Sequence, residues 1–444
     1  MIKYFKKHKI GLIIWIIFII FIVISNINSI IYVFNAPHEK KIPEKYLIIQ
    51  QETLKKQKDY LKKLEICGNS DDIVDNIKFK KVVTGKDFTC ALSLNGDVAC
   101  WGANDKGQLG LGCNLDKDIP YRIKNLEGAV DISAGIDHVC AVIKDGTVKC
   151  WGSGEYRKLG QKELKSFSKE KYKNSNTPIL VEGFSDAILV SVGDKSSCAV
   201  IKDGTVKCWG EGGLDLRHFN KVDYDIDGEM VVIPIINLVN VVKISVGDNV
   251  ACAIIKDGTV KCWGDDYGYK KINKKGPFYD YEPIIFEYLK KVQDISVGHD
   301  HVCAVIQDGT VKCWGSGSMS RFGDGRLNTR EDYPFKIKEL NNIESVTVGR
   351  SHTCVEGISG DTKCWSSGGY GKLGNGNTNY EKYPKIISGL KVKQIDAGVN
   401  HTCAIIKDGT VKCWGANIRG QIGNPSAFYA QLDPINPLFY PNSK

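Results

Sequence analysis

The chain has 444 residues, a formal net charge of +9 and 16 cysteines. Four of the positive charges come from lysines in the first nine residues, and the remaining excess is too small and too diffuse to form a nucleic-acid-binding surface. The even number of cysteines argues against a reducing cytosol and favours a disulfide framework.

The N-terminus differs in composition from the rest of the chain. Residues 1–9 contain lysines and no acidic residue, and residues 10–34 are mainly apolar and long enough to span a bilayer. We therefore predict a cytoplasmic tail followed by a single-pass transmembrane signal anchor in the cell membrane. The rest of the protein would then face the periplasm or the cell exterior. A cleaved signal peptide is one alternative, and a soluble protein with a buried apolar helix is another.

Residues 35–80 are predicted to form a stalk or linker. Residues 44–65 are typical of a polar helix in which leucines recur every seven positions, at Leu47, Leu54 and Leu61. Glutamines occupy the other seam positions of this heptad, so a solvated spacer helix is favoured over a short coiled coil.

Residues 81–444 contain one pattern seven times. Two cysteines stand ten positions apart, a tryptophan follows the second cysteine, and a glycine precedes the first by five positions. The cysteine pairs are Cys90 with Cys100, Cys140 with Cys150, Cys198 with Cys208, Cys252 with Cys262, Cys303 with Cys313, Cys354 with Cys364 and Cys403 with Cys413. The period of about 52 residues suits a four-stranded propeller blade better than a helical solenoid repeat.

Each cysteine pair flanks a predicted β-hairpin. In the second repeat, short β-rich runs surround the turn Lys144-Asp145-Gly146, and Asp-Gly is a hairpin signal. A three-residue loop with Gly146 in the left-handed conformation sets Cys140 opposite Cys150 at a non-hydrogen-bonded site, where Cα atoms lie about 4.5 Å apart. That separation suits a disulfide, so seven disulfides within hairpins are predicted.

Two further observations concern the cysteines. Cys67 and Cys113 remain after the seven pairs, and we predict a bridge between the stalk and the first repeat; the alternative is two free or intermolecular thiols. A histidine stands two positions before the first cysteine in four repeats, at His138, His301, His352 and His401. Because three repeats lack it and the cysteine spacing is unlike that of a zinc knuckle, no metal site is predicted. We expect these histidines to pack beside the disulfides; lining one rim of a central channel is the alternative.

The combined pattern, His-x-Cys-Ala…Asp-Gly-x-Val-x-Cys-Trp-Gly, resembles the repeats of the regulator of chromosome condensation family in its cysteine-bearing bacterial form. The Gly-Gln-Leu-Gly that follows in such repeats stands at Gly107–Gly110, with variants at Gly371–Gly374 and Gly420–Gly423 and a weaker one at Arg157–Gly160. The resemblance implies an all-β, seven-bladed β-propeller. It does not specify function, because family members include nucleotide-exchange factors and enzyme inhibitors.

A proline begins another predicted strand between successive hairpins. In four repeats this proline lies 19 or 20 residues after the tryptophan. The final tryptophan, Trp414, is followed 20 residues later by Pro434, which begins a strand over residues 434–439 that no cysteine hairpin follows. No such strand precedes the first hairpin. We therefore predict that residues 434–439 pair within the first repeat and close the ring, because an open sheet edge promotes aggregation.

The sequence contains no recognised catalytic or cofactor-binding motif, so we predict a protein that is not an enzyme and has no cofactor. Its predicted function is that of a membrane-anchored binding module with a monomeric head, which engages a protein or cell-wall partner through rim loops. The aromatic residues favoured for binding are Tyr267, Tyr269, Phe278, Tyr279 and Tyr281. Three alternatives remain: an inhibitor of a periplasmic serine hydrolase, a guanine-nucleotide exchange factor and an extracellular propeller enzyme such as a lyase.

Overall fold

The computed structural model describes residues 67, 77–161, 173–210, 214, 232–264, 283–427 and 429–437. These residues belong to a unit that extends from Leu64 to Lys444. The predicted cytoplasmic tail, the predicted anchor and the predicted stalk helix all lie outside the described residues. Within the described ranges, no helix is both long and apolar enough to cross a membrane.

Each repeat is built from β-strands in a constant order. The first strands are β1 (Phe79–Thr84), β5 (Ala129–Ala134), β9 (Ala187–Val192), β13 (Val241–Val246), β17 (Val292–Val297) and β21 (Ile343–Val348). The second strands are β2 (Phe88–Ser93), β6 (His138–Ile143), β10 (Ser196–Ile201), β14 (Val250–Ile255), β18 (His301–Ile306), β22 (His352–Gly357) and β25 (His401–Ile406).

The third and fourth strands complete each repeat. The third strands are β3 (Val98–Gly102), β7 (Val148–Gly152), β11 (Val206–Gly210), β15 (Val260–Gly264), β19 (Val311–Ser316), β23 (Asp361–Ser366) and β26 (Val411–Ala416). The fourth strands are β4 (Lys117–Arg122), β8 (Ser175–Val181), β12 (Ile233–Pro234), β16 (Ile284–Ile285), β20 (Arg330–Lys336), β24 (Glu381–Ala397) and β27 (Ala430–Ile435). Short 3-10 helices follow three of the third strands: η2 (Glu155–Arg157), η4 (Ser318–Ser320) and η5 (Gly369–Gly371).

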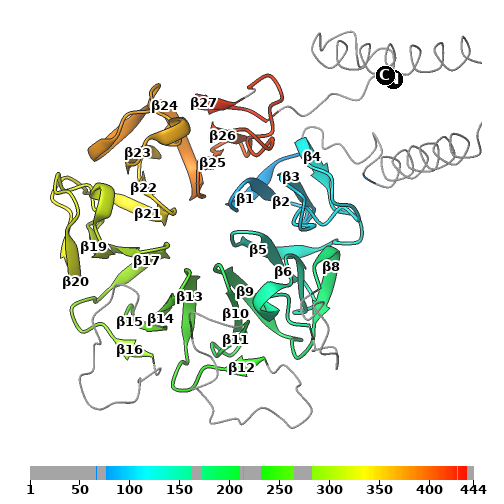
Figure 1. Ribbon diagram of the computed structural model, residues 1–444. Helices are drawn as coiled ribbons and strands as arrows, with labels where there is room; N and C mark the ends of the chain where they lie inside the picture. Colours follow the sequence, from blue (N-terminus) through cyan, green and yellow to red (C-terminus); the bar gives the residue numbers. More distant parts are fainter. Residues whose placement is uncertain are drawn as a thin grey trace, which may run out of the picture. The chain divides into compact units, whose positions relative to one another are not determined.

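The sheets stand side by side around a common centre, with the first strand of each repeat innermost (Figure 1). All strand pairs are antiparallel, and the described strands form five sheets of four strands and one sheet of seven. The larger sheet exists because β24 pairs with β23 as the outer strand of the sixth repeat and with β25 as the inner strand of the seventh. The chain is therefore an all-β protein of propeller type, as predicted.

The hairpin register agrees with the predicted turn. Cys140 lies directly opposite Cys150, the amide of Gly146 donates to the carbonyl of Ile143, and Gly146 has a φ of 81°. Because the paired cysteines face each other across two adjacent strands, a disulfide can join them without displacing the backbone.

All sixteen cysteines are paired in the structure. Seven disulfides lie within hairpins, with Cα separations of 4.0 to 4.1 Å. They join Cys90 to Cys100, Cys140 to Cys150, Cys198 to Cys208, Cys252 to Cys262, Cys303 to Cys313, Cys354 to Cys364 and Cys403 to Cys413. An eighth disulfide joins Cys67 to Cys113, so no cysteine is free.

The hydrophobic core is divided among the contacts between neighbouring repeats. Each of seven apolar clusters combines residues of two successive repeats, with the tryptophan of the later one packed against the cysteine hairpin of the earlier one. One buried position departs from the apolar pattern. Glu356 replaces the Leu, Val or Ile found there in the other repeats, and it lies opposite Thr362 where the others have valine.

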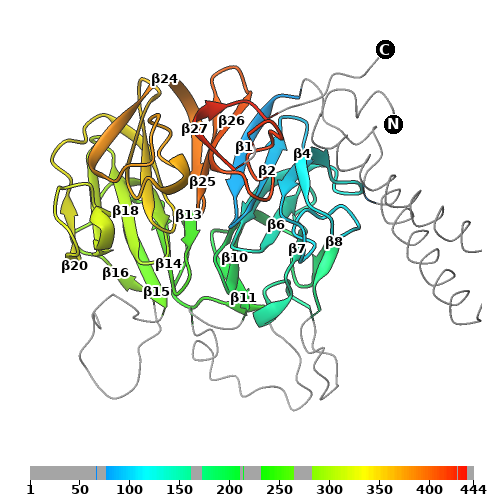
Figure 2. The same ribbon diagram turned by 45° about the horizontal axis from the view of Figure 1, so that its top comes forward.

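The prediction of how the ring closes is wrong. Strand β27 pairs with β26 and completes the seventh repeat, whereas the first repeat has four strands of its own, β1 to β4 (Figure 2). No strand is surplus among those described, because the proline-containing strand is the last strand of each repeat and not the first. The prolines lie in or beside these outer strands, at a sheet edge where a missing N–H is tolerated.

Packing and polar contacts, without a shared strand, join the last repeat to the first. From the second repeat to the seventh, a Ser or Thr two positions before the repeated glycine accepts from a backbone N–H of the next inner strand, as Ser133 does from Val192 at 3.1 Å. At the junction, Asp396 takes this position and accepts from the amide of Thr84 at 2.6 Å. Phe79 also donates its amide to the carbonyl of Gly409 at 2.9 Å.

Candidate functional site at the channel mouth

The seven glycines of the repeat form a narrow ring at the inner ends of the first strands. A Cβ atom at Gly349 would lie 2.6 Å from the carbonyl oxygen of Gly398, and one at Gly398 would lie 2.7 Å from that of Gly85. Real Cβ atoms do not approach backbone oxygens this closely. At six of the seven positions, the glycine is therefore required by the close approach of the next repeat; at Gly85, a Cβ atom would instead meet the ring of Phe88 in the same repeat.

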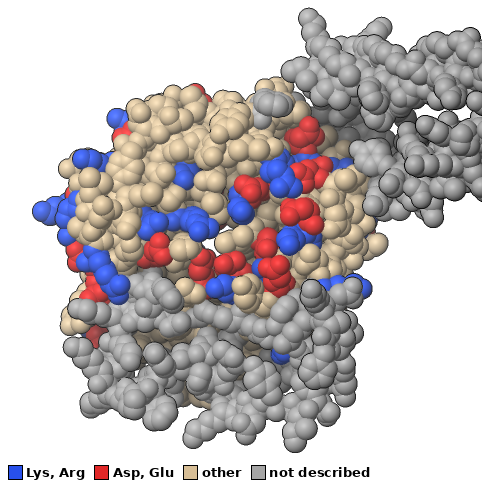
Figure 3. All heavy atoms as spheres, in the orientation of Figure 1, with Lys and Arg blue, Asp and Glu red and all other residues tan. Residues whose placement is uncertain are grey.

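The residue after each glycine is placed at the mouth of the central channel. A cavity of about 110 Å³ lies there, and it includes this residue from six of the seven repeats: Ile136, Asp194, Asp248, His299, Arg350 and Val399. Figure 3 shows acidic and basic side chains gathered around the hollow at the centre of the face. The repeated scaffold thus presents a different side chain from each repeat at one position, which is typical of a binding site on a rigid framework.

A chain of ionic contacts runs along one side of this mouth. His299 lies between two carboxylates, with its Nε2 3.1 Å from Asp248 and its Nδ1 2.6 Å from Asp300. Arg321 contacts the other oxygen of Asp300 at 3.0 Å. The hydrogen bond to Asp300 raises the pKa of His299, whereas burial raises the pKa of Asp248 to about 6.

The repeated histidines do not line the channel. His138, His301, His352 and His401 are fully buried, and each places Nε2 2.7 to 3.0 Å from a Ser or Thr hydroxyl of the next repeat. Burial lowers the pKa of all four, to about 3 for His301 and His401, so they are neutral at physiological pH. They pack beside the disulfides as expected and join neighbouring repeats, including the last to the first.

The loops after the third strands bring basic side chains under the same face. The carbonyl of Lys158 accepts the indole N–H of Trp209 at 3.0 Å, and its buried ammonium forms an ion pair with Asp137. Lys372 is also buried, but its ammonium donates to the hydroxyl of Ser351 at 2.7 Å in place of a carboxylate. Burial lowers the pKa of Lys372 to about 8.

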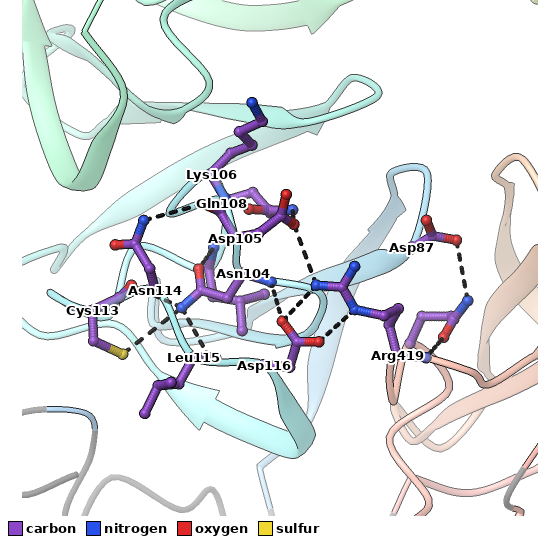
Figure 4. Close-up of polar contacts among 12 residues, drawn as sticks. Asp87, Asn104, Asp105, Lys106, Gln108, Cys113, Asn114, Leu115, Asp116 and Arg419 are labelled. Carbon is purple, nitrogen blue, oxygen red and sulfur yellow. Dashed lines mark hydrogen bonds and ion pairs between the residues drawn. The ribbon is translucent and has the colours of Figure 1, made fainter. Parts of the chain in front are cut away.

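Polar contacts also join the last repeat to the first on this face (Figure 4). The guanidinium of Arg419 donates to Asp116 at 2.8 Å and to Asp105 at 3.3 Å. The side chain of Asn104 organises the receiving loop, since its Nδ2 donates to the carbonyl of Cys113 at 2.8 Å and its Oδ1 accepts from the amide of Leu109 at 3.0 Å. The loop that carries the Cys67–Cys113 bridge is therefore part of the junction.

The structure tests only some of the predicted site residues. The aromatic residues Tyr267, Tyr269, Phe278, Tyr279 and Tyr281 lie outside the described residues, so their role in partner binding remains a prediction. Among the residues that are described, no group of three His, Cys, Asp or Glu side chains is arranged to hold a metal ion. Sequence reasoning missed the channel-mouth residues, although the signal was present: the position after the repeated glycine varies from one repeat to the next.

The arrangement suits ligand binding better than catalysis. The mouth combines unlike charges with apolar groups around a small cavity, and several of its titratable groups are held in ion pairs. Nothing among these described groups pairs a nucleophile with a base. Recognition of a partner or ligand by charge and shape is the chemistry that these residues can perform.

Comparison with known proteins identifies the repeat. The regulator of chromosome condensation (RCC1) repeat matches residues 95–142, 145–200 and 364–405, and a second form of the same repeat matches residues 79–108, 129–157, 241–268, 292–321 and 392–421. Together these ranges cover more than half of the chain.

The curated relatives are similar to this chain over only part of their own length. The human E3 ubiquitin-protein ligase HERC2 is 27% identical over 292 residues, which cover 63% of this chain and 6% of the ligase. The ultraviolet-B receptor UVR8 of Arabidopsis thaliana is 26% identical over 343 residues, which cover 73% of this chain and 63% of the receptor. The chain thus spans a small fraction of the ligase and less than two thirds of the receptor.

Solved structures agree in fold. Prp20p from Saccharomyces cerevisiae has a TM-score of 0.58 at 21% identity, with 72% of this chain and 80% of Prp20p covered. Human WBSCR16 has a TM-score of 0.62 at 20% identity, with 74% and 87% covered. Because the repeat matches extend over more than half of the sequence, the chain belongs to the regulator of chromosome condensation (RCC1) repeat family.

Proposed function

We propose that this protein is a non-enzymatic binding module whose seven-bladed propeller is held outside the cytoplasmic membrane by residues 10–34. Each disulfide hairpin would form one blade, and β24 would serve two blades. The face that carries the channel mouth, together with the long loops that follow the third strands in the sequence, would engage a protein or a component of the cell envelope.

The pairing of all sixteen cysteines is the observation that carries this proposal. Such a framework persists in an oxidising compartment and is rare where thiols are kept reduced. The apolar segment and the lysines before it independently favour export with a retained anchor. The exchange-factor alternative requires a cytosolic or nuclear location, so both observations weigh against it.

Protein binding is supported by relatives of the same fold. Prp20p binds Gsp1p and histones, and a second solved structure contains Kap60 bound to the yeast protein. The propeller is a common scaffold for regulators and binding proteins. The similarity to HERC2 covers 6% of that protein, so it does not support ligase activity for this chain.

Two experiments test the proposal. A reporter enzyme that is active only outside the cytoplasm, fused after Lys444, should be active, and deletion of residues 10–34 should abolish that activity. A full-length fusion that is produced but shows no reporter activity would refute the proposed location. Replacement of residues 265–281 by a Gly-Ser loop should prevent cross-linking to the partner in intact cells, whereas the same replacement at residues 162–172 serves as the control. Equal cross-linking by both variants would show that the aromatic loop does not bind.

A further inference from the structure

The charges at the channel mouth are divided between two sides. Asp194 and Asp248 come from the third and fourth repeats, whereas Arg350 comes from the sixth. Among the described residues, neither Asp194 nor Arg350 has an ion-pair partner, and the cavity lies between them. Asp194, Asp248 and Arg350 all line this one cavity, where burial is the main cause of the raised pKa of Asp248.

We propose that this cavity binds a small zwitterion of the α-amino-acid class. Its ammonium group would lie against Asp194 and Asp248, and its carboxylate would accept from the guanidinium of Arg350. This inference concerns a small-molecule site and does not rest on the proposed location or protein partner.

Charge balance favours a zwitterion over a simple cation or anion. The chain Asp248–His299–Asp300–Arg321 alternates in sign and compensates itself when His299 is protonated. Among the residues that line the cavity, Asp194 and Arg350 then remain as one negative and one positive charge. A ligand with a single charge would pair with one of these two side chains. The other side chain would lose part of its contact with water without gaining a partner, which is unfavourable.

The size and the remaining walls of the cavity limit the ligand further. The volume of about 110 Å³ has room for several water molecules, which a small organic molecule could displace. Ile136 and Val399 line the cavity at the equivalent positions of the second and seventh repeats. These apolar groups suit a short apolar side chain, so alanine-sized ligands are expected to fit better than large or charged ones.

Calorimetric titration of the purified full chain tests the proposal with three probes. L-Alanine carries both charges, L-alaninamide keeps only the ammonium, and N-acetyl-L-alanine keeps only the carboxylate. We expect L-alanine to bind at least about tenfold more tightly than either analogue. Equal affinity for L-alanine and one analogue, or no heat with L-alanine up to about 10 mM, would overturn the proposal.

Two variants test which side chain binds the ammonium group and which binds the carboxylate. Asp194→Asn should weaken alaninamide binding and leave N-acetylalanine unaffected, and Arg350→Gln should do the reverse. Lys86→Gln is the matched control, because Lys86 follows the first glycine but does not line the cavity, and it should bind L-alanine as the parent does. If both analogues respond equally to each variant, the two sides do not recognise separate charges and the proposal fails.

Discussion

Replacement of Glu356 by valine should prevent the loss of folding stability that this residue causes at high pH. This side chain is 5% exposed and occupies a position that is Leu, Val or Ile in the six other repeats. Its carboxyl accepts from the hydroxyl of Ser345 at 3.0 Å, and no cation pairs with it among the described residues. Burial raises its pKa from 4.5 to about 7.

The size of the effect follows from this shift. Because the folded state holds the proton more tightly than the unfolded state, the contribution to stability is fully present below about pH 4.5 and is lost as pH rises through about 7. At 1.36 kcal/mol per pKa unit, the loss is at most about 3 kcal/mol. The Glu356→Val variant lacks this titration, and its valine would lie at the position whose equivalents in the other repeats pack into the apolar core shared with the next repeat, here the core between the sixth and seventh repeats.

Urea unfolding of the full chain with its disulfides intact provides the assay. The stability advantage of Glu356→Val over the parent should be larger at about pH 8.5 than at about pH 5, by about 2 to 3 kcal/mol. Glu339→Gln, an exposed change in the loop before the sixth repeat, is the control and should follow the parent at both pH values. If the parent and Glu356→Val lose or gain stability in parallel over this range, Glu356 does not retain its proton in the folded state.

Three further predictions concern the ring. Gly349→Ala should lower the free energy of unfolding by about 3 kcal/mol, because its Cβ would clash with a neighbouring carbonyl oxygen. Gly389→Ala is the control: its Cβ has open space around it, so it should lower the free energy of unfolding by only about 1 kcal/mol. Equal losses in urea unfolding would contradict the close approach of neighbouring repeats. Removal of one bridge by the double change of Cys140 and Cys150 to Ser should cost about 2 to 3 kcal/mol, and peptide mapping without reduction should recover the other seven bridges unchanged. Truncation after Gly423 removes β27 and exposes the edge of β26, so it should increase aggregation, while the amide of Phe79, which donates to Gly409 across the junction of the first and last repeats, stays protected in hydrogen exchange. Loss of that protection would indicate that β27 is needed to hold the ring closed.

The sequence predicts the local structure well because the determinants are local. The Asp-Gly turn and the cysteine spacing determine the hairpin register, and Cys140 lies opposite Cys150 as expected. The family resemblance predicts the propeller, and the repeat matches confirm the family. The pairing of Cys67 with Cys113 also agrees with expectation, since these are the two cysteines left outside the hairpins.

The boundaries between repeats cannot be predicted from local sequence in the same way. A cyclic pattern of four strands can be divided after any strand, and the sequence alone does not show which connection passes from one sheet to the next. Assignment of the proline-containing strand to the following repeat leads to the wrong prediction for residues 434–439. The structure resolves this, because β4 already completes the first repeat.

The channel-mouth residues escape prediction for a different reason. The residues that recur in every repeat, or in most repeats, are those that hold the scaffold together. His301 is an example, because its Nε2 lies 2.7 Å from Thr353 of the next repeat. Binding residues are those that differ at a fixed place, and Asp194, Asp248 and Arg350 meet that criterion. Their proximity depends on ring closure, which brings together positions that are far apart in the chain.

The short span of the hairpin bridges affects how the protein matures. Each joins cysteines separated by 10 residues within two adjacent strands, whereas only the Cys67–Cys113 bridge spans 46. Contacts between nearby residues form faster and at lower entropic cost than distant ones. If the chain is exported as proposed, a hairpin could oxidise as soon as it emerges from the translocation machinery, before the cysteines of the next hairpin are available for mispairing. Export of the chain in one direction would supply the correct partners in order, and the ring would assemble from units that are already cross-linked.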